Sequence, residues 1–152
     1  MNRILILDID GVLITTPTWK PDHLHHDGYS DFNSRCVDNL NALFDFDNFE
    51  IWLSSSRRSA KTLPEFNLIF EARGIKKKII GYLPEHPCRM SRKEEIEKFI
   101  IENDITRFLI IDDDKSLNNL EDEIKKWWIK TDLMLGFDLN KLSESRRILN
   151  LT

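Results

Sequence analysis

The sequence lacks the features that mark membrane and secreted proteins. Its 152 residues contain no apolar run that approaches the roughly 18 residues needed to cross a bilayer. The first apolar stretch begins almost at the N-terminus and is soon interrupted by Asp8, which leaves no space for a secretory signal. We therefore expect a cytoplasmic protein with no membrane partner.

Cysteine is scarce, and internal repeats, low-complexity tracts and interdomain linkers are missing. Cys36 and Cys88 are the two cysteines, and their spacing matches no common metal site. Free thiols in a reducing compartment are therefore the expected state. With 41% hydrophobic residues, the chain has enough apolar side chains for one core. These observations predict a single domain over residues 1–152.

An excess of positive charge is also missing, since the net charge is −4. This value excludes a globally basic nucleic-acid-binding protein. The charges are unevenly distributed, however. Residues 57–98 contain 11 Lys/Arg and 6 Asp/Glu, whereas residues 1–56 contain 3 and 9. A solvated helix face is the ordinary explanation for the basic segment, and a surface that faces phosphate is the functional alternative.

Apolar runs alternate with helical patterns along most of the chain. The runs predict strands at residues 3–7, 49–53, 78–81, 107–111 and, more weakly, 128–131. Helices are predicted to begin near Ser34, Thr62, Ser91 and Ser116, and a closing helix is predicted over 139–150. Thr62 with Glu65, and Ser91 with Glu94, have the spacing of capping boxes. This alternation predicts an α/β fold with a doubly wound, mainly parallel, five-stranded sheet.

The first predicted strand leads directly into two aspartates, Asp8 and Asp10, and then into Gly11. In open α/β sheets, ligands bind beyond the carboxyl ends of the strands. Two neighbouring carboxylates repel each other unless a cation lies between them or one carries a proton. A metal site, or a nucleophile with a general acid, would explain the pair, and a simple turn cap is the structural alternative. Gly11 permits a sharp backbone turn at a positive φ.

Hydroxyl and basic residues follow the second predicted strand. They are Ser54, Ser55, Ser56, Arg57 and Arg58. Hydroxyls and backbone N–H groups at a strand end can bind an anion, and an arginine adds a planar fork that suits phosphate. An ordinary serine-rich turn with solvated arginines is the alternative interpretation.

A third group lies at the start of a predicted helix. If Ser91 is the N-cap, Arg92 and Lys93 occupy the first helical turn. The helix dipole disfavours cations there by about 0.3–1 kcal/mol each. A sequence that breaks a local rule in this way indicates a functional site, here one in which a cation and the helix amides bind phosphate together. The sequence does not separate Arg92 from Lys93.

The fourth predicted strand ends in Asp112, Asp113 and Asp114. Adjacent carboxylates at the end of a buried strand are unfavourable without a cation. Mg²⁺ suits them because it prefers oxygen ligands. The sequence leaves open which of Asp112 and Asp113 would bind the metal directly, and whether Asp114 contributes or only forms the turn.

The stretch Asp8-Ile9-Asp10-Gly11 resembles motif I of haloacid dehalogenase (HAD) superfamily phosphatases. The resemblance implies a Rossmann-like domain in which Asp8 is the nucleophile and Asp10 the general acid/base. It also implies that Mg²⁺ is bound by Asp8, Asp112, Asp113 and the backbone carbonyl of Asp10. The phosphate-binding residues that it implies are Ser54, Ser55, Arg58 and Arg92 or Lys93.

A closer similarity is to small HAD domains linked to RNA-repair (Swiss Army Knife) proteins. Their pattern Leu-Ser-Ser-Ser-Trp-Arg corresponds to residues 53–58, where Arg57 replaces the tryptophan and Arg58 matches the arginine. Their pattern Arg-x-x-Glu-Ile corresponds to residues 92–96. This similarity implies a phosphorylated substrate such as an RNA or DNA end. Small metabolites or nucleotides, and a phosphate-binding regulatory module without turnover, are the alternatives.

Residues 14–33 interrupt the alternation of strands and helices. They hold two prolines, Gly28 and the histidines His23, His25 and His26. In HAD proteins a flap or a cap covers the site at this point, and this segment is too short for a folded cap domain. A zinc site is the alternative, but the histidine spacing matches no common zinc motif. A mobile polar loop over an open site is therefore the favoured interpretation.

Overall fold

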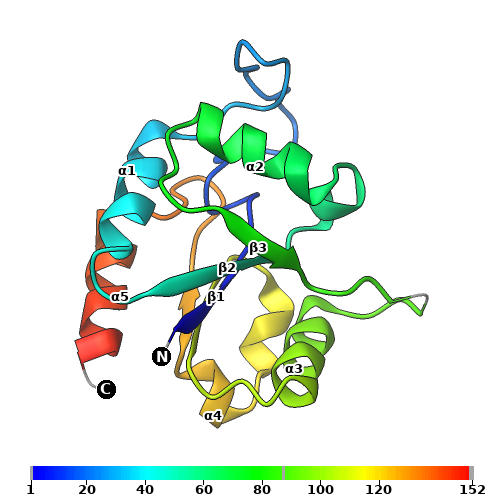
Figure 1. Cartoon of the computed structure of the whole chain (residues 1–152), viewed down its shortest axis with the longest axis vertical. Helices are drawn as coiled ribbons and strands as arrows, with labels where there is room; N and C mark the ends of the chain where they lie inside the picture. Colours follow the sequence, from blue (N-terminus) through cyan, green and yellow to red (C-terminus); the bar gives the residue numbers. More distant parts are fainter. Residues whose placement is uncertain (1, 87, 151–152) are drawn as a thin grey trace.

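The computed structural model describes residues 2–86 and 88–150, and its strands form one parallel sheet (Figure 1). The strands are β1 (Arg3–Leu7), β2 (Phe49–Leu53), β3 (Ile79–Tyr82), β4 (Phe108–Asp112) and β5 (Trp128–Lys130). Their order in the sheet is β3-β2-β1-β4-β5. The chain leaves β1 for one side of the sheet and later crosses to the other. The carboxyl end of β1 is thus the switch point at which Rossmann-like sheets bind ligands.

The described residues form five α-helices and two short 3₁₀ helices, of which all but the last connect the strands. They are α1 (Ser34–Leu43), η1 (Ser56–Ser59), α2 (Leu63–Ala72), α3 (Arg92–Glu102), η2 (Lys115–Asn119), α4 (Asp122–Lys125) and α5 (Leu139–Asn150). Both predicted capping boxes are present, Thr62 with Glu65 at α2 and Ser91 with Glu94 at α3. None of the helices in the described part of the chain is long and apolar enough to cross a bilayer.

Two helix starts differ from the sequence prediction. The N-cap of α1 is Asn33 rather than Ser34, because the Asn33 carboxamide accepts hydrogen bonds from the N–H groups of Arg35 and Cys36. The prediction of one continuous helix that begins at Ser116 is wrong. The segment is divided into η2, which Asp114 caps, and α4, because the backbone is extended at Leu120.

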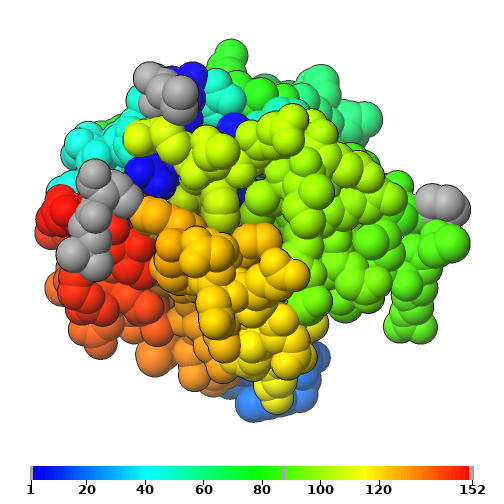
Figure 2. Space-filling view, turned by 90° about the horizontal axis from the view of Figure 1, so that it is seen from below, coloured from blue at the N-terminus to red at the C-terminus, as the bar shows by residue number. Residues whose placement is uncertain are grey.

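Helices cover both faces of the sheet, as a doubly wound fold requires. One apolar cluster joins Leu5 and Leu7 of β1 to buried side chains of α1, α2 and α5. A second cluster joins Ile6 to buried side chains of α3, η2 and α4. Figure 2 shows the second face from outside, with α3 in yellow-green beside the 115–125 segment in yellow. β1 is therefore buried on both sides, and its carboxyl end is held rigidly.

The segment 14–33 has no helix or strand beyond isolated bridges such as that between Leu24 and Ser30. It is nevertheless fastened to the domain. Arg73 at the end of α2 binds both carboxylate oxygens of Asp27, at 2.7 and 3.0 Å, and donates to the Ser30 carbonyl at 2.8 Å. These bonds attach the segment to the end of α2 at more than one residue.

Candidate active site

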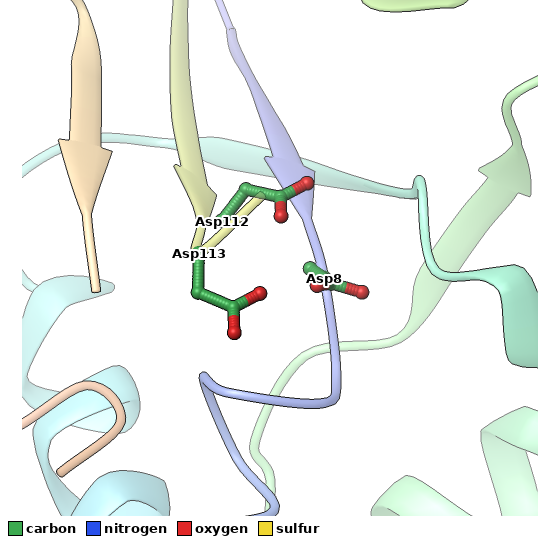
Figure 3. Close-up of side chains that lie close together, drawn as sticks. All are labelled: Asp8, Asp112 and Asp113. Carbon is green, nitrogen blue, oxygen red and sulfur yellow. The ribbon is translucent and has the colours of Figure 1, made fainter. Parts of the chain in front are cut away.

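Three carboxylates meet at the carboxyl edge of the sheet (Figure 3). Asp8 directly follows β1, and Asp112 and Asp113 lie at the end of β4. β1 and β4 are parallel, with Leu7 opposite Ile111, so the residues that follow them emerge side by side. One oxygen atom from each carboxylate lies within 4.8 Å of the others. Asp8 is 5% exposed and Asp112 is fully buried.

The surroundings of these carboxylates oppose negative charge. Burial raises the pKa of Asp8 well above its ordinary value of 3.8, and the charge of Asp112 raises it further. Burial is also the main cause that raises the pKa of Asp113 to about 6, again with a contribution from Asp112. The group is therefore short of positive charge, and a cation bound there would relieve both effects.

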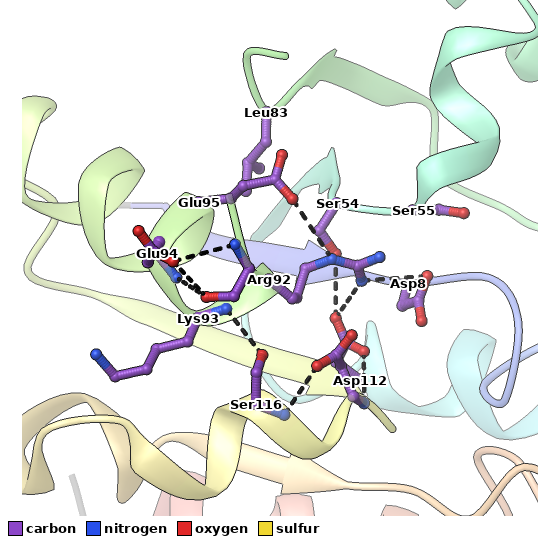
Figure 4. A network of polar contacts seen from close by, with 12 residues as sticks. Asp8, Ser54, Ser55, Leu83, Arg92, Lys93, Glu94, Glu95, Asp112 and Ser116 are labelled. Carbon is purple, nitrogen blue, oxygen red and sulfur yellow. Dashed lines mark hydrogen bonds and ion pairs between the residues drawn. The ribbon is translucent and has the colours of Figure 1, made fainter. Parts of the chain in front are cut away.

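Among the residues that the structure describes, one cation, the guanidinium of Arg92, reaches this group (Figure 4). Its Nη1 lies 2.6 Å from Asp112 Oδ2 and 3.5 Å from Asp8 Oδ1. Burial acts to lower the pKa of Arg92, but the charges of Asp112 and Asp8 outweigh it and raise that pKa. A single guanidinium offsets one of three negative charges. The donor set, carboxylate oxygens with a remaining negative charge, therefore fits a hard divalent cation such as Mg²⁺.

Lys93, the other candidate of the predicted pair, lies apart from the carboxylates. Its Nζ binds Glu97 at 2.8 Å along α3, and its backbone N–H donates to Ser116 Oγ at 3.1 Å. In Figure 4 its side chain points away from Asp8. The structure thus brings Arg92 to the carboxylates and leaves Lys93 on the outer side of the helix.

The two predicted serines have different surroundings. Ser54 is fully buried, and its Oγ donates to Asp112 Oδ2 at 3.5 Å, so its hydroxyl lies at the carboxylate group. Ser55 is also fully buried, but its Oγ accepts the N–H of Arg57 at 3.2 Å and caps η1. Ser54 therefore belongs to the group, whereas Ser55 stabilises the turn that follows it.

Arg58 does not join the carboxylates, contrary to its prediction as a phosphate ligand. Its Nη1 donates to the carbonyls of Ser54 and Ser55 at 2.6 and 3.0 Å, and its Nε donates to the carbonyl of Leu83 at 2.9 Å. Its Nη2 forms an ion pair with Glu95. All three guanidinium nitrogens are thus engaged within the protein, and at 6% exposed the side chain is not available to a ligand.

Glu95 connects this buried arginine to the site. Besides binding Arg58, its carboxylate lies 3.9 Å from Nε of Arg92. Arg58 therefore helps to position Arg92 through Glu95. Sequence reasoning did not include Glu95 among the site residues, although it lies within the Arg-x-x-Glu-Ile pattern.

The carboxylate of Asp10 lies outside the group of three and is bound by Arg57. Nε of Arg57 donates to Asp10 Oδ2 at 2.7 Å, and Nη2 donates to Oδ1 at 2.9 Å. This partner was missed by sequence reasoning. The available signal was that Arg57 replaces a tryptophan in the pattern of related domains.

Gly11 carries the chain closely past Asp113. Its φ is +76°, and a Cβ atom at this position would lie 2.1 Å from Asp113 Oδ2. A side chain at residue 11 would be strained and would also displace the carboxylate. The glycine therefore allows the turn after β1 to close over the site.

Comparison with known proteins gives a family match over most of the chain. A family model described as "HAD domain in Swiss Army Knife RNA repair proteins" matches residues 4–142. The matched range includes every residue of the carboxylate group, together with Asp10, Ser54 and Arg92. A search of the curated proteins found no match.

Proposed function

We propose, because this chain belongs to the family of HAD domains in Swiss Army Knife RNA repair proteins, that it is a Mg²⁺-dependent phosphomonoester hydrolase. The observation that carries the proposal is the group of Asp8, Asp112 and Asp113, in which Asp8 and Asp112 are buried and a single arginine of the described residues balances three carboxylates. A family match supports a HAD-type hydrolase, and the charge deficit supports a metal-dependent one.

Asp8 and Asp113 are the side chains that we assign to the metal, together with the backbone carbonyl of Asp10. Asp112 is less available because its Oδ2 accepts from Arg92 and its Oδ1 accepts the N–H of Asp114 at 3.0 Å. Bound Mg²⁺ would supply the positive charge that lets a phosphate dianion approach a carboxylate. Asp112 then serves mainly to orient Arg92 and Ser54.

We assign the first chemical step to Asp8. Its carboxylate oxygen attacks phosphorus, the ester P–O bond breaks, and Asp10 gives a proton to the leaving oxygen. Asp10 then removes a proton from the water that attacks the aspartyl-phosphate, which releases phosphate and regenerates Asp8. Ser54 and Arg92 would bind the non-bridging oxygens during both steps.

A polynucleotide end is the substrate class that we propose. The family is described by its occurrence in RNA repair proteins. The segment 14–33 has no helices or strands of a folded cap over the site.

The test compares the wild type with Asp8→Asn on 3′- and 5′-phosphorylated oligonucleotides, nucleotides and sugar phosphates, with Mg²⁺ or Zn²⁺ after chelation. Asp27→Asn is the matched control because that carboxylate lies in the 14–33 segment and binds Arg73. We expect Mg²⁺-dependent release of phosphate from an oligonucleotide end. The rate should fall by about 10³-fold or more in Asp8→Asn and stay near that of the wild type in the control.

Three outcomes would contradict parts of the proposal. Undiminished activity of Asp8→Asn would exclude Asp8 as the nucleophile. Turnover of small phosphates alone would exclude the polynucleotide substrate. Binding of Mg²⁺ and phosphate by a folded wild type without any turnover would instead support a silent phosphate-binding module.

A further inference from the structure

Arg57 is the point at which Asp10 and the 14–33 segment meet. It lies in η1, just after β2, and its guanidinium contacts four side chains. They are Asp10, Asp22, Tyr29 and Ser30. Three of these four residues belong to the segment 14–33, so one side chain joins the carboxylate of Asp10 to this segment.

The contact with Asp10 fixes the orientation of a carboxylate. The two hydrogen bonds, at 2.7 and 2.9 Å, form the parallel pair that holds a guanidinium and a carboxylate in one plane. The side chain of Asp10 is nevertheless 45% exposed, against 24% for Arg57. A leaving group or a water molecule can therefore reach Asp10 while Arg57 holds it from the opposite side.

The contacts with the segment use the rest of the guanidinium. Nη2 lies 3.1 Å from Asp22 Oδ2, and Nη1 lies 3.2 Å from both the Tyr29 hydroxyl and Ser30 Oγ. Ser30 Oγ in turn donates to Asp22 Oδ2 at 2.6 Å. Arg57 thus sits in a closed network, and a displacement of the segment would pull on the group that orients Asp10.

Charge argues against a different role, the binding of a second substrate phosphate. Arg57 faces two carboxylates, Asp10 and Asp22, and its other partners are neutral hydroxyls. The immediate surroundings therefore carry no surplus of positive charge. A further phosphate would have to displace one of these carboxylates, which favours an orienting role over an anion-binding one.

A second arginine fastens the same segment without touching Asp10. Arg73 binds Asp27 and the Ser30 carbonyl, and the Tyr29 ring lies 5.6 Å from the Arg57 guanidinium and 5.9 Å from that of Arg73. A variant of Arg73 is therefore a matched control for a variant of Arg57. Arg73 fastens the segment alone, whereas Arg57 fastens the segment and Asp10.

We propose that Arg57 is a positioning residue that orients the carboxylate of Asp10 and couples this orientation to the placement of the 14–33 segment. The catalytic part of this proposal rests on the proposed function, in which Asp10 exchanges protons with the leaving group and with water. The structural part, the link between Asp10 and the 14–33 segment, does not depend on the proposed function.

The experiment compares Arg57→Gln, Arg57→Lys and Arg73→Gln with the wild type, each shown by circular dichroism to be folded. Two quantities are measured: kcat and KM on the best substrate of the panel above, and the rate of chymotrypsin cleavage in the segment. Trp19 and Leu24, 75% and 68% exposed, are the expected cleavage sites.

We expect Arg57→Gln to lower kcat by about 10²-fold with little change in KM, as a misplaced catalytic group does. Arg57→Lys should recover part of this loss, because it keeps the charge without the fork. Both glutamine variants should accelerate cleavage of the segment. Arg73→Gln, which leaves the contact between Arg57 and Asp10 in place, should lower kcat much less than Arg57→Gln does.

An unchanged kcat in Arg57→Gln would overturn the positioning role. An equal loss in Arg73→Gln would also overturn it, because loosening of the segment would then explain the whole effect. If the wild type has no turnover, the proposed function fails and cleavage rates alone decide the link. Asp10→Ala should then accelerate cleavage at Trp19 and Leu24, and an unchanged rate would overturn the coupling.

Discussion

Two acidic regions near the carboxyl edge of the sheet differ in how their charges are balanced. Asp8, Asp112 and Asp113 share the single guanidinium of Arg92. Burial raises the pKa of Asp8 and that of Asp113. In the 14–33 segment, Asp22 and Asp27 each bind an arginine. Hydrogen bonds hold the pKa of each below its ordinary value, mainly from Ser30 for Asp22 and from Arg73 for Asp27.

This difference separates the proposed metal site from an acidic surface. The 14–33 segment contains histidines and aspartates, the residue types of a metal site, but Asp22 and Asp27 already have arginine partners. The group of Asp8, Asp112 and Asp113 has one arginine, Arg92, for three carboxylates. A deficit of positive charge among buried carboxylates, rather than their number, identifies the site that a divalent cation would complete.

The largest expected effect that tests this comparison is on Mg²⁺ affinity. Asp113→Asn removes a proposed ligand and should weaken Mg²⁺ binding by about 10²-fold or more, by analogy with lost coordination elsewhere. Asp27→Asn, the matched variant in the other region, should leave the affinity unchanged. Isothermal titration calorimetry measures both. Equal weakening in the two variants would remove the distinction between the regions.

A glycine in each region allows a second comparison. Gly11 and Gly28 both have a positive φ, but a Cβ at Gly28 would have no atom within 4 Å, whereas one at Gly11 would meet Asp113. Both alanine variants should lose about 1–3 kcal/mol of unfolding free energy through backbone strain. Gly11→Ala should lose more and should also weaken Mg²⁺ binding. Denaturant titration with and without Mg²⁺ distinguishes the two, and an equal loss would contradict the close approach to Asp113.

At neutral pH and without metal, removal of one carboxylate charge from each region should change the Tm of the protein in opposite directions. Asp113→Asn relieves repulsion in a cation-poor group and should raise Tm, whereas Asp27→Asn breaks an ion pair with Arg73 and should lower it. Shifts of about 2–4 °C are expected. Thermal unfolding in a chelating buffer measures them. A fall of Tm in both variants would show that Asp113 is already balanced.

The free energy of unfolding should also depend on pH, and this effect is the smallest of those predicted. The pKa of Asp113 rises from 3.8 to about 6 on folding, so the folded state binds this proton more tightly than the unfolded state. Without metal, stability should therefore fall as the pH rises from about 4 to about 6. The lowered pKa values of Asp22 and Asp27 act below this window, where stability falls with decreasing pH. Asp113→Asn should reduce the slope between pH 4 and 6 and leave the part that comes from Asp8, whose pKa is also raised, which unfolding at a series of pH values would show.

Local signals in the sequence predicted much of this structure. Apolar runs located the five strands because β1, β4 and β5 contribute buried side chains to both apolar clusters, and β2 and β3 contribute buried side chains to one. The capping boxes of α2 and α3 involve residues three positions apart. Asp8, Asp112 and Asp113 could be grouped in advance because parallel strands end at one edge.

Other features depend on contacts that no local pattern encodes. Whether Arg92 or Lys93 reaches the carboxylates depends on the rotation of α3 about its axis, which packing against the sheet sets. The pairing of Arg57 with Asp10 joins residues 47 positions apart. Arg58 appeared to be a phosphate ligand because its sequence neighbours suited one, but the fold buries it against backbone carbonyls.

The most direct test of the central claim is to trap the reaction on Asp8. The wild type is mixed with Mg²⁺ and a 3′- or 5′-phosphorylated oligonucleotide, quenched rapidly in acid, digested and analysed by mass spectrometry. We expect a peptide that contains Asp8 and carries one phosphoryl group. This phosphorylated peptide should be absent without Mg²⁺ and in Asp8→Asn. Sustained phosphate release with an unmodified Asp8, or a phosphoryl group on another residue, would contradict this expectation.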